Sequence, residues 1–328
     1  MSIRNSLLKS WHKPNYVTVL LWPLSVLYRV LFAANRCLYQ CGLKSVYRAP
    51  VPVIVVGNVS VGGTGKTPLV IYLVELLTAQ GFKPGVISRG YHSQAHAGPL
   101  LVSPQTPVQQ AGDEPALIVR RTGVPLCIDS NRKAAIECLL DNHDINVVIS
   151  DDGLQHFALQ RDIEICLLDQ TSPMLNEHLL PAGPFREPLM RASSCDIVVH
   201  HGGSEEQGIT MQLEATSPSP LVTATSAEGA EFNASQPFVA VAGIGNPDRF
   251  FNTCREYGFT FESKPFPDHH QFSKSDIDFG DRIVLMTEKD AVKCQEFADA
   301  RHWYLPVSAK LSTGFDEQVI ALLTKVVS

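Results

Sequence analysis

Residues 53–67 read VIVVGNVSVGGTGKT, a short apolar run followed by a glycine-rich turn and the first residues of a helix. Glycines allow the backbone to wrap closely around phosphate oxygens, and the N-terminus of the following helix points N–H groups at them. In such a loop Lys66 reaches the terminal phosphates and the hydroxyl of Thr67 binds Mg²⁺. The stretch therefore predicts a nucleoside-triphosphate site, against the alternative of a chance Gly-Lys-Thr in an unstructured loop.

The glycine-rich turn departs from the usual pattern at one position. Ser60 stands where that pattern has a glycine, five residues before Gly65, so neighbouring glycines must supply the flexibility. Val61 occupies the place of the extra lysine found in a variant of this loop. The nucleotide-binding candidates in the turn are Asn58, Gly62, Gly63, Thr64, Gly65, Lys66 and Thr67.

Short apolar runs alternate with helical stretches from residue 50 onward. Strands are predicted at 53–56, 85–88, 100–103, 125–128, 147–150, 163–168 and 197–200, with helices at 67–79 and, after a cap at Ser130, up to Leu140. Strands that alternate with helices form a mostly parallel sheet covered on both faces. We expect an α/β, P-loop NTPase-like fold.

The amino-acid composition changes between residues 201 and 236, where Gly, Ser, Thr, Ala and Pro dominate. A second set of elements follows, with strands at 238–242 and 283–286, a helix ending at residue 257 and closing helices. The predicted division is a basic, apolar, membrane-associating segment (1–49), a P-loop kinase core (50–205), a linker or extended hairpin (206–236) and a smaller C-terminal α/β domain closing over the nucleotide (237–328).

Charge is unevenly distributed along the chain. The net charge is −6, yet the first 48 residues carry seven basic side chains and no Asp or Glu, so the remainder has a balance of −13. An acidic body with a basic, apolar arm argues against nucleic acid as a partner and for an anionic membrane surface. No obligate protein partner is evident. The eight cysteines form no C-x-x-C pair, which is typical of reduced cytoplasmic thiols.

The N-terminal segment contains a strongly apolar stretch at residues 16–34. Nineteen helical residues could just cross a bilayer core of about 30 Å, but Pro23 interrupts the stretch and Arg29 sits inside it. A helix that begins at Pro23 has two faces, the first with Leu24, Leu27, Tyr28 and Leu31 and the second with Ser25, Arg29 and Arg36. That pattern favours a helix lying in the membrane interface, with internal packing as the alternative.

An acidic motif follows a second apolar run. Residues 147–156 read VVISDDGLQH, so Asp151 and Asp152 come at the end of a predicted strand. In P-loop proteins this strand lies beside the loop strand, and its carboxylate reaches the metal or a metal-bound water. We therefore assign Asp151 and Asp152 to Mg²⁺, while Gln155 and His156 either support the site or simply orient the turn.

Seven motifs together resemble the tetraacyldisaccharide 4′-kinase family, the lipid A 4′-kinases. They are GNVSVGGTGKTP (57–68), SRGY (88–91), GDEP (112–115), DDGLQH (151–156), LLPAGPFREP (179–188), FPDHHQF (266–272) and TEKD (287–290), in this order. The resemblance implies an enzyme on the cytoplasmic face of the inner membrane, peripheral or monotopic. It would use ATP and Mg²⁺ to phosphorylate the 4′-hydroxyl of a tetraacyl glucosamine disaccharide 1-phosphate, the lipid A disaccharide precursor.

The resemblance also implies catalytic roles. Asp113 would accept the proton of the sugar hydroxyl, paired with His269 by motif alignment, although His270 stays open, and Lys66 would act on the phosphates. Bringing Asp113 to His269 requires the two domains to close across ATP. The alternative for Asp113 is a helix cap before Pro115.

Further residues are assigned by the same likeness. Arg186 would bind the triphosphate and Glu187 the metal, with a surface ion pair as the alternative for either. Glu114, Lys289 and Asp290 are supporting candidates, and Thr287–Asp290 either covers the base or caps a helix. The competing function is a P-loop ATPase or GTPase switch or maturation factor without a lipid acceptor, which would share the loop and Asp151 but predicts no GDEP or DHH motif.

Overall fold

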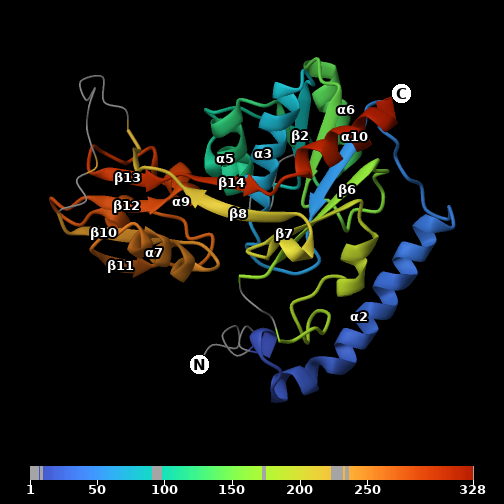
Figure 1. Cartoon of the computed structure of the whole chain (residues 1–328), viewed down its shortest axis with the longest axis horizontal. Helices are drawn as coiled ribbons and strands as arrows, with labels where there is room; N and C mark the ends of the chain where they lie inside the picture. The colour runs from blue at the N-terminus through green and yellow to red at the C-terminus, as the bar shows by residue number, and fades with distance from the viewer. Residues whose placement is uncertain are drawn as a thin grey trace.

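The computed structural model describes residues 7, 10–90, 98–171, 175–222, 232 and 236–327. Tyr91 of the SRGY motif and residues 223–231 and 233–235 of the predicted linker lie outside this description. The described chain forms two β-sheets, one of nine strands and one of five, with a long helix on the flank of the larger sheet that faces away from the smaller one (Figure 1).

The larger sheet has the strand order β14-β8-β7-β6-β1-β5-β2-β4-β3. Its strands are β1 (Val53–Gly57), β2 (Pro84–Ser88), β3 (Leu100–Val102), β4 (Leu126–Ile128), β5 (Val147–Asp151), β6 (Ile163–Asp169), β7 (Ile197–His201), β8 (Thr210–Ala215) and β14 (Val307–Leu311). The interior pairs are parallel, and only the edge strands β3 and β14 pair antiparallel. The carboxyl ends of β1 and β5 therefore lie side by side, where the phosphate loop and the acidic motif begin.

Helices cover both faces of this sheet, because alternate residues of its apolar strands point in opposite directions. Ile54 and Val56 pack with α3 (Lys66–Ala79), α5 (Asp113–Thr122) and α10 (Phe315–Val327), whereas Val53 and Val55 pack with α6 (Arg132–Asn142). Shorter turns are α4 (Val108–Ala111), η1 (Leu189–Ser194) and η2 (Glu205–Gln207). The predicted α/β, P-loop NTPase-like fold is confirmed. The cap of α6 is Asn131, whose side chain accepts from Ala134, and not Ser130.

The smaller sheet has the order β11-β10-β12-β13-β9 and is parallel except at β9. Its strands are β9 (Ser219–Pro220), β10 (Phe238–Ala242), β11 (Phe261–Pro265), β12 (Val284–Thr287) and β13 (His302–Leu305), with helices α7 (Pro247–Glu256), α8 (Lys274–Ile277) and α9 (Glu288–Cys294). Separate apolar clusters form on its two faces, as expected for a second α/β unit.

The predicted division of the chain needs correction at both ends of the smaller unit. Strand β8 lies inside the predicted linker but pairs with β7 in the larger sheet, and β14 pairs antiparallel with β8. After β14, α10 buries Phe315, Val319 and Leu323 in the larger core. Residues 307–327 thus return to the larger sheet, although only Pro306 separates β14 from β13 of the smaller sheet. Local hydrophobic pattern does not tell which of two sheets a strand will join.

The N-terminal helix α2 (Tyr16–Gln40) also differs from its prediction. It begins after the capping residue Asn15 and continues through Pro23, so the proline does not interrupt it. Its length and hydropathy are sufficient to cross a membrane, although these two properties alone are weak evidence. The buried residues of α2 are polar, Thr18 and Ser25, while apolar side chains face outward, including Val19 and Leu20 with about three quarters of their surface exposed (74% and 75%).

Candidate active site

The phosphate loop joins the carboxyl end of β1, the central strand of the larger sheet, to α3. Gly65 caps α3 with a left-handed φ of 96°, and Gly62 has φ 122°, conformations that favour glycine. A Cβ at Gly62 or Gly63 would meet nothing within 4 Å, so the outer side of the loop is open. Ser60 has no positive φ and forms a β-bridge with Phe185, which explains why the usual glycine is not needed there.

Lys66 lies on the first turn of α3 and points back toward the acidic motif. Its Nζ donates to Asn58 Oδ1 at 3.1 Å and lies 3.6 Å from Asp152 Oδ1. Asn58 is fully buried and also donates from Nδ2 to the Thr64 hydroxyl at 3.2 Å. The predicted loop residues therefore hold one another, and Thr67 follows Lys66 as the second residue of α3.

Asp151 ends β5, where it is buried and held by two residues outside the predicted set. Ser88 Oγ donates to Asp151 Oδ2 at 3.1 Å, and Arg132 donates to the Asp151 carbonyl at 2.9 Å. Burial raises the pKa of the Asp151 carboxyl to about 7, and the nearby Glu114 and Asp152 carboxylates add to the rise. Ser88 also ends a strand, β2, and this shared position was the sequence signal that could have found it.

Asp152 follows in a left-handed conformation, with φ 49°, which is costly for a residue other than glycine. Arg186 NH1 donates to its two carboxylate oxygens at 2.9 and 2.8 Å. Burial raises the pKa of Asp152, but Lys66 and Arg186 outweigh it and hold that pKa below its usual value. We call Asn58, Lys66, Asp151, Asp152 and Arg186 the loop cluster.

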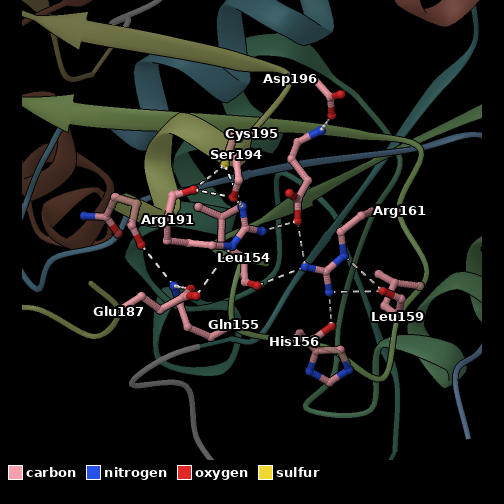
Figure 2. A network of polar contacts seen from close by, with 12 residues as sticks. Leu154, Gln155, His156, Leu159, Arg161, Glu187, Arg191, Ser194, Cys195 and Asp196 are labelled. Atoms are coloured by element: carbon pink, nitrogen blue, oxygen red, sulfur yellow. Dashed lines mark hydrogen bonds and ion pairs between the residues drawn. The ribbon is translucent and has the colours of Figure 1, made fainter. Parts of the chain in front are cut away.

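Glu187 does not join the loop cluster directly. Its carboxylate is fully buried, accepts from Gln155 Nε2 at 2.7 Å and lies 3.6 Å from Arg191 Nε (Figure 2). Gln155 in turn contacts the cluster, because Nε2 donates to the Asn58 carbonyl and Oε1 accepts from Arg186. Across the residues that the structure describes, no group of three or more His, Cys, Asp or Glu side chains is arranged to hold a metal ion.

The predicted pair of Asp113 and His269 joins the two sheets. Asp113 is the first residue of α5 in the larger unit, and its Oδ2 lies 3.1 Å from His269 Nδ1 in the smaller unit. The cap of α5 is Gly112, with no side-chain capping bond, so the structure contradicts a capping role for Asp113. His269 has φ 57°, the second positive φ among described non-glycine residues. His270 instead lies 3.4 Å from Asp276 Oδ2.

Two lysines of α9 complete this region. Lys293 Nζ lies 3.7 Å from Asp113 Oδ2, and Lys289 Nζ donates to Glu114 Oε1 at 3.1 Å. Burial raises the pKa of Asp113, but the hydrogen bond with His269 and the charges of these lysines outweigh it and lower that pKa. Lys293 was missed, although it lies four residues after Lys289 on the same helix face. We call Asp113, Glu114, His269, Lys289 and Lys293 the inter-sheet cluster.

Asp290 belongs to the frame of the smaller unit. It is fully buried, and Oδ2 accepts from Gly243 N and from the Thr287 hydroxyl, both at 2.7 Å. Thr287 caps α9 by accepting from Asp290 N. Asp290 therefore fixes the start of α9 and so the positions of Lys289 and Lys293.

The two clusters are neighbours. Burial raises the pKa of Glu114 in the inter-sheet cluster, but Lys289 and then Lys66 of the loop cluster outweigh it and lower that pKa. Conversely, Glu114 helps to raise the pKa of Asp151. The charges of the two clusters therefore influence one another.

Comparison with known proteins assigns the chain to one family. The family model for tetraacyldisaccharide-1-P 4′-kinase matches residues 17–324. The chain belongs to the tetraacyldisaccharide 4′-kinase family. A tetraacyldisaccharide 4′-kinase of Vibrio cholerae is 44% identical over 313 residues (94% of this chain, 92% of the relative), and that of Shewanella frigidimarina is 46% identical over 321 residues (96% and 94%).

A solved structure of the same family has the same fold. The "apo" form of LpxK from Aquifex aeolicus, in complex with ATP, superimposes with a TM-score of 0.78 at 30% identity, covering 93% of this chain and 99% of that one. The resemblance seen in the seven sequence motifs is thereby confirmed, and so is the predicted fold class.

Proposed function

We propose that this protein transfers the γ-phosphate of ATP to the 4′-hydroxyl of a tetraacyl glucosamine disaccharide 1-phosphate, a step in lipid A biosynthesis. The observation that carries the proposal is the contact of Asp113 with His269 beside the loop cluster. Family membership supports the substrate, because the relatives are named for this acceptor. A switch ATPase needs the loop and Asp151 but has no use for the pair between the sheets.

The loop cluster fits the triphosphate and Mg²⁺. The open side of Gly62 and Gly63, the helix N-terminus and the Lys66 ammonium suit the phosphates. Asp151 and Asp152 are adjacent carboxylates, and burial together with the charges of Glu114 and Asp152 raises the pKa of Asp151, so a bound divalent cation would stabilise its ionised form. Thr67, Asp151 and Asp152 would hold Mg²⁺, which neutralises charge on the phosphates when bound, and Glu187 would act through Gln155.

The inter-sheet cluster supplies the base in this proposal. The sugar oxygen attacks the γ-phosphorus, the bond from that phosphorus to the bridging β–γ oxygen breaks, and ADP leaves. The hydroxyl proton passes to the Asp113 carboxylate, which its lowered pKa keeps ionised, and His269 orients that carboxylate or takes up the proton. Lys66 and Arg186 stabilise the phosphate charge, and Lys289 holds Glu114 beside the acceptor. The smaller unit would close over the nucleotide as the acceptor binds.

We further propose that α2 holds the enzyme on the cytoplasmic face of the inner membrane as a peripheral or monotopic protein. Ser25 Oγ and Tyr28 Oη donate to carbonyls of the body, at 2.7 and 2.9 Å. A helix that crossed the bilayer would lose these contacts, whereas one that lies in the interface keeps them while its outward apolar side chains enter the lipid. Deletion of residues 1–35 should move the protein to the soluble fraction.

The deciding experiment is transfer from labelled ATP to the tetraacyl disaccharide, with mass spectrometry locating the phosphate. We expect a 4′-phosphate, and ATP hydrolysis that stays negligible until the glycolipid is added. Rapid hydrolysis without the glycolipid, or only with a protein partner, would support the switch ATPase or GTPase instead.

A further inference from the structure

Helix α2 contacts the loop that carries Arg186. The Tyr28 hydroxyl, in the middle of the helix, donates to the carbonyl of Arg186 at 2.9 Å, and the Ser25 hydroxyl donates to the carbonyl of Leu179 at 2.7 Å. Both acceptors belong to residues 176–188, which we call the bridging loop. Burial raises the pKa of Tyr28, and the Glu187 carboxylate adds to the rise, so the hydroxyl keeps its proton and donates.

The segment before α2, at Ser10 and Trp11, also contacts the bridging loop. Trp11 Nε1 donates to the Pro181 carbonyl at 2.9 Å, and the fully buried Asn176 donates from Nδ2 to the Ser10 carbonyl at 2.7 Å. The N-terminal arm thus contacts the bridging loop at several points along its length. Displacement of α2 would displace the loop with it.

The other side of the bridging loop lies against the phosphate loop. Arg186 N donates to the Val59 carbonyl at 2.7 Å, and Val61 N donates to the Pro184 carbonyl at 2.8 Å. The Arg186 side chain then reaches Asp152. Arg186 is therefore held at three points: its carbonyl by the N-terminal helix, its amide by the phosphate loop and its guanidinium by the acidic motif.

We infer that Tyr28 and Ser25 are positioning residues through which α2 sets the place of Arg186 at the phosphates. The helix proposed to bind the membrane then also supports the residues of the phosphate site. The inference rests on the proposed function for the role of Arg186 toward ATP, but it concerns residues that act through the bridging loop.

The test is a double-mutant cycle with Tyr28→Phe, which removes one hydroxyl and keeps the ring that stacks on Phe32. In the otherwise wild-type protein we expect kcat for lipid phosphorylation and affinity for a fluorescent ATP analogue each to fall about three- to tenfold, as for loss of one hydrogen bond. In the Arg186→Ala background the same change should have no further effect. Vesicle binding should be unchanged, and Ser25→Ala should act in the same direction.

The matched control is Tyr39→Phe on the same helix, because Tyr39 packs on Phe157 and its hydroxyl has no hydrogen bond to any residue that the structure describes. It should leave kcat and nucleotide affinity unchanged. Equal losses from Tyr28→Phe in both backgrounds, or no loss in either, would overturn the inference. A wild-type protein that makes no lipid product would instead overturn the proposed function, and the nucleotide-affinity arm would still decide the role of Tyr28.

Discussion

The loop cluster lies at the carboxyl ends of two central strands of one sheet, whereas the inter-sheet cluster joins two sheets. Lys66 follows the phosphate loop that begins at the end of β1, and Asp151 and Asp152 lie at the end of the neighbouring strand β5. The register of a single sheet therefore fixes their spacing. Asp113 and His269 are 156 residues apart and meet only because α5 packs against the smaller unit. The first arrangement is set by secondary structure, and the second depends on how two units dock.

This difference predicts different mutational behaviour. Changes in the loop cluster should impair nucleotide binding and transfer together, because its groups are aimed at the phosphates. Changes in the inter-sheet cluster should impair transfer while ATP still binds, because in the proposed mechanism its groups act on the acceptor hydroxyl.

Lys66→Ala should reduce lipid phosphorylation by about 10³–10⁵-fold, because a cation at the transferring phosphoryl group contributes on that scale. Nucleotide affinity should also fall, since Lys66 is the ammonium at the start of α3 beside Asp152. Steady-state transfer assays and nucleotide titration measure both. Lys83→Ala, an exposed lysine paired with Asp144, is the control and should behave as wild type. Near-normal turnover in Lys66→Ala would exclude the loop from catalysis.

Asp113→Asn should reduce turnover by about 10²–10⁴-fold with nearly normal ATP affinity, because only the proton acceptor is lost. His269→Ala should lose comparable activity, and the double variant should lose less than the product of the singles. The hydrogen bond with His269 lowers the pKa of Asp113, so its removal should move the acidic limb of the pH–rate profile to higher pH.

The control for this pair is His270→Ala, which alters the adjacent histidine that packs between Phe266 and Phe272. It should keep most of the activity, with reduced thermal stability. If His270→Ala and His269→Ala lose equal activity at equal stability, then the contact between Asp113 and His269 has no special role. The inter-sheet cluster would then not have the catalytic role that distinguishes it from the loop cluster.

The same contrast explains how much could be predicted from the sequence. The turn at Gly62–Lys66 and the run ending in Asp151 are local signals, and the parallel β1–β5 pairing places them together as expected. Ser88 ends a predicted strand, as Asp151 does, but that position alone does not tell that its strand lies beside β5. Arg132 could not be found from local pattern, because its contact with Asp151 depends on how α6 packs against the sheet. For Asp113 the residues alone left a helix cap open, and only the family resemblance favoured the pair with His269.

Tertiary packing also explains why some predictions from the sequence were wrong. Strand β14 joins the larger sheet although its neighbour β13 lies in the smaller one, a choice that no local pattern encodes. Tyr28 faces the body with Ser25 and not the solvent side with Leu24 and Leu27, because carbonyls of the bridging loop attract both hydroxyls. Glu187 turns inward to Arg191 and Gln155 for the same reason, since a buried carboxylate needs donors.

The smallest predicted effect concerns acid stability beside the loop cluster. Burial lowers the pKa of His156 to about 4 from an ordinary 6.5, and the charges of Arg132, Arg161 and Arg89 add to the shift. Arg161 also donates to the carbonyls of Leu154 and His156, which holds this turn next to the positive charge (Figure 2). Between pH 6.5 and 4 the unfolded chain therefore binds more protons at this position than the folded chain.

It follows that the stability linked to neutral His156 is fully present above pH 6.5 and is lost as pH falls toward 4. The free energy of unfolding should therefore fall by about 1 kcal/mol from pH 7 to pH 5, a value reduced to allow for the partial exposure of the His156 ring. Urea unfolding of the nucleotide-free protein at both pH values measures it. His156→Gln should lack this part of the pH dependence, whereas the exposed His143→Gln should retain it. If wild type and His156→Gln lose the same stability on acidification, His156 is not protonated on unfolding in this range, and the acid sensitivity of the protein must arise from other groups.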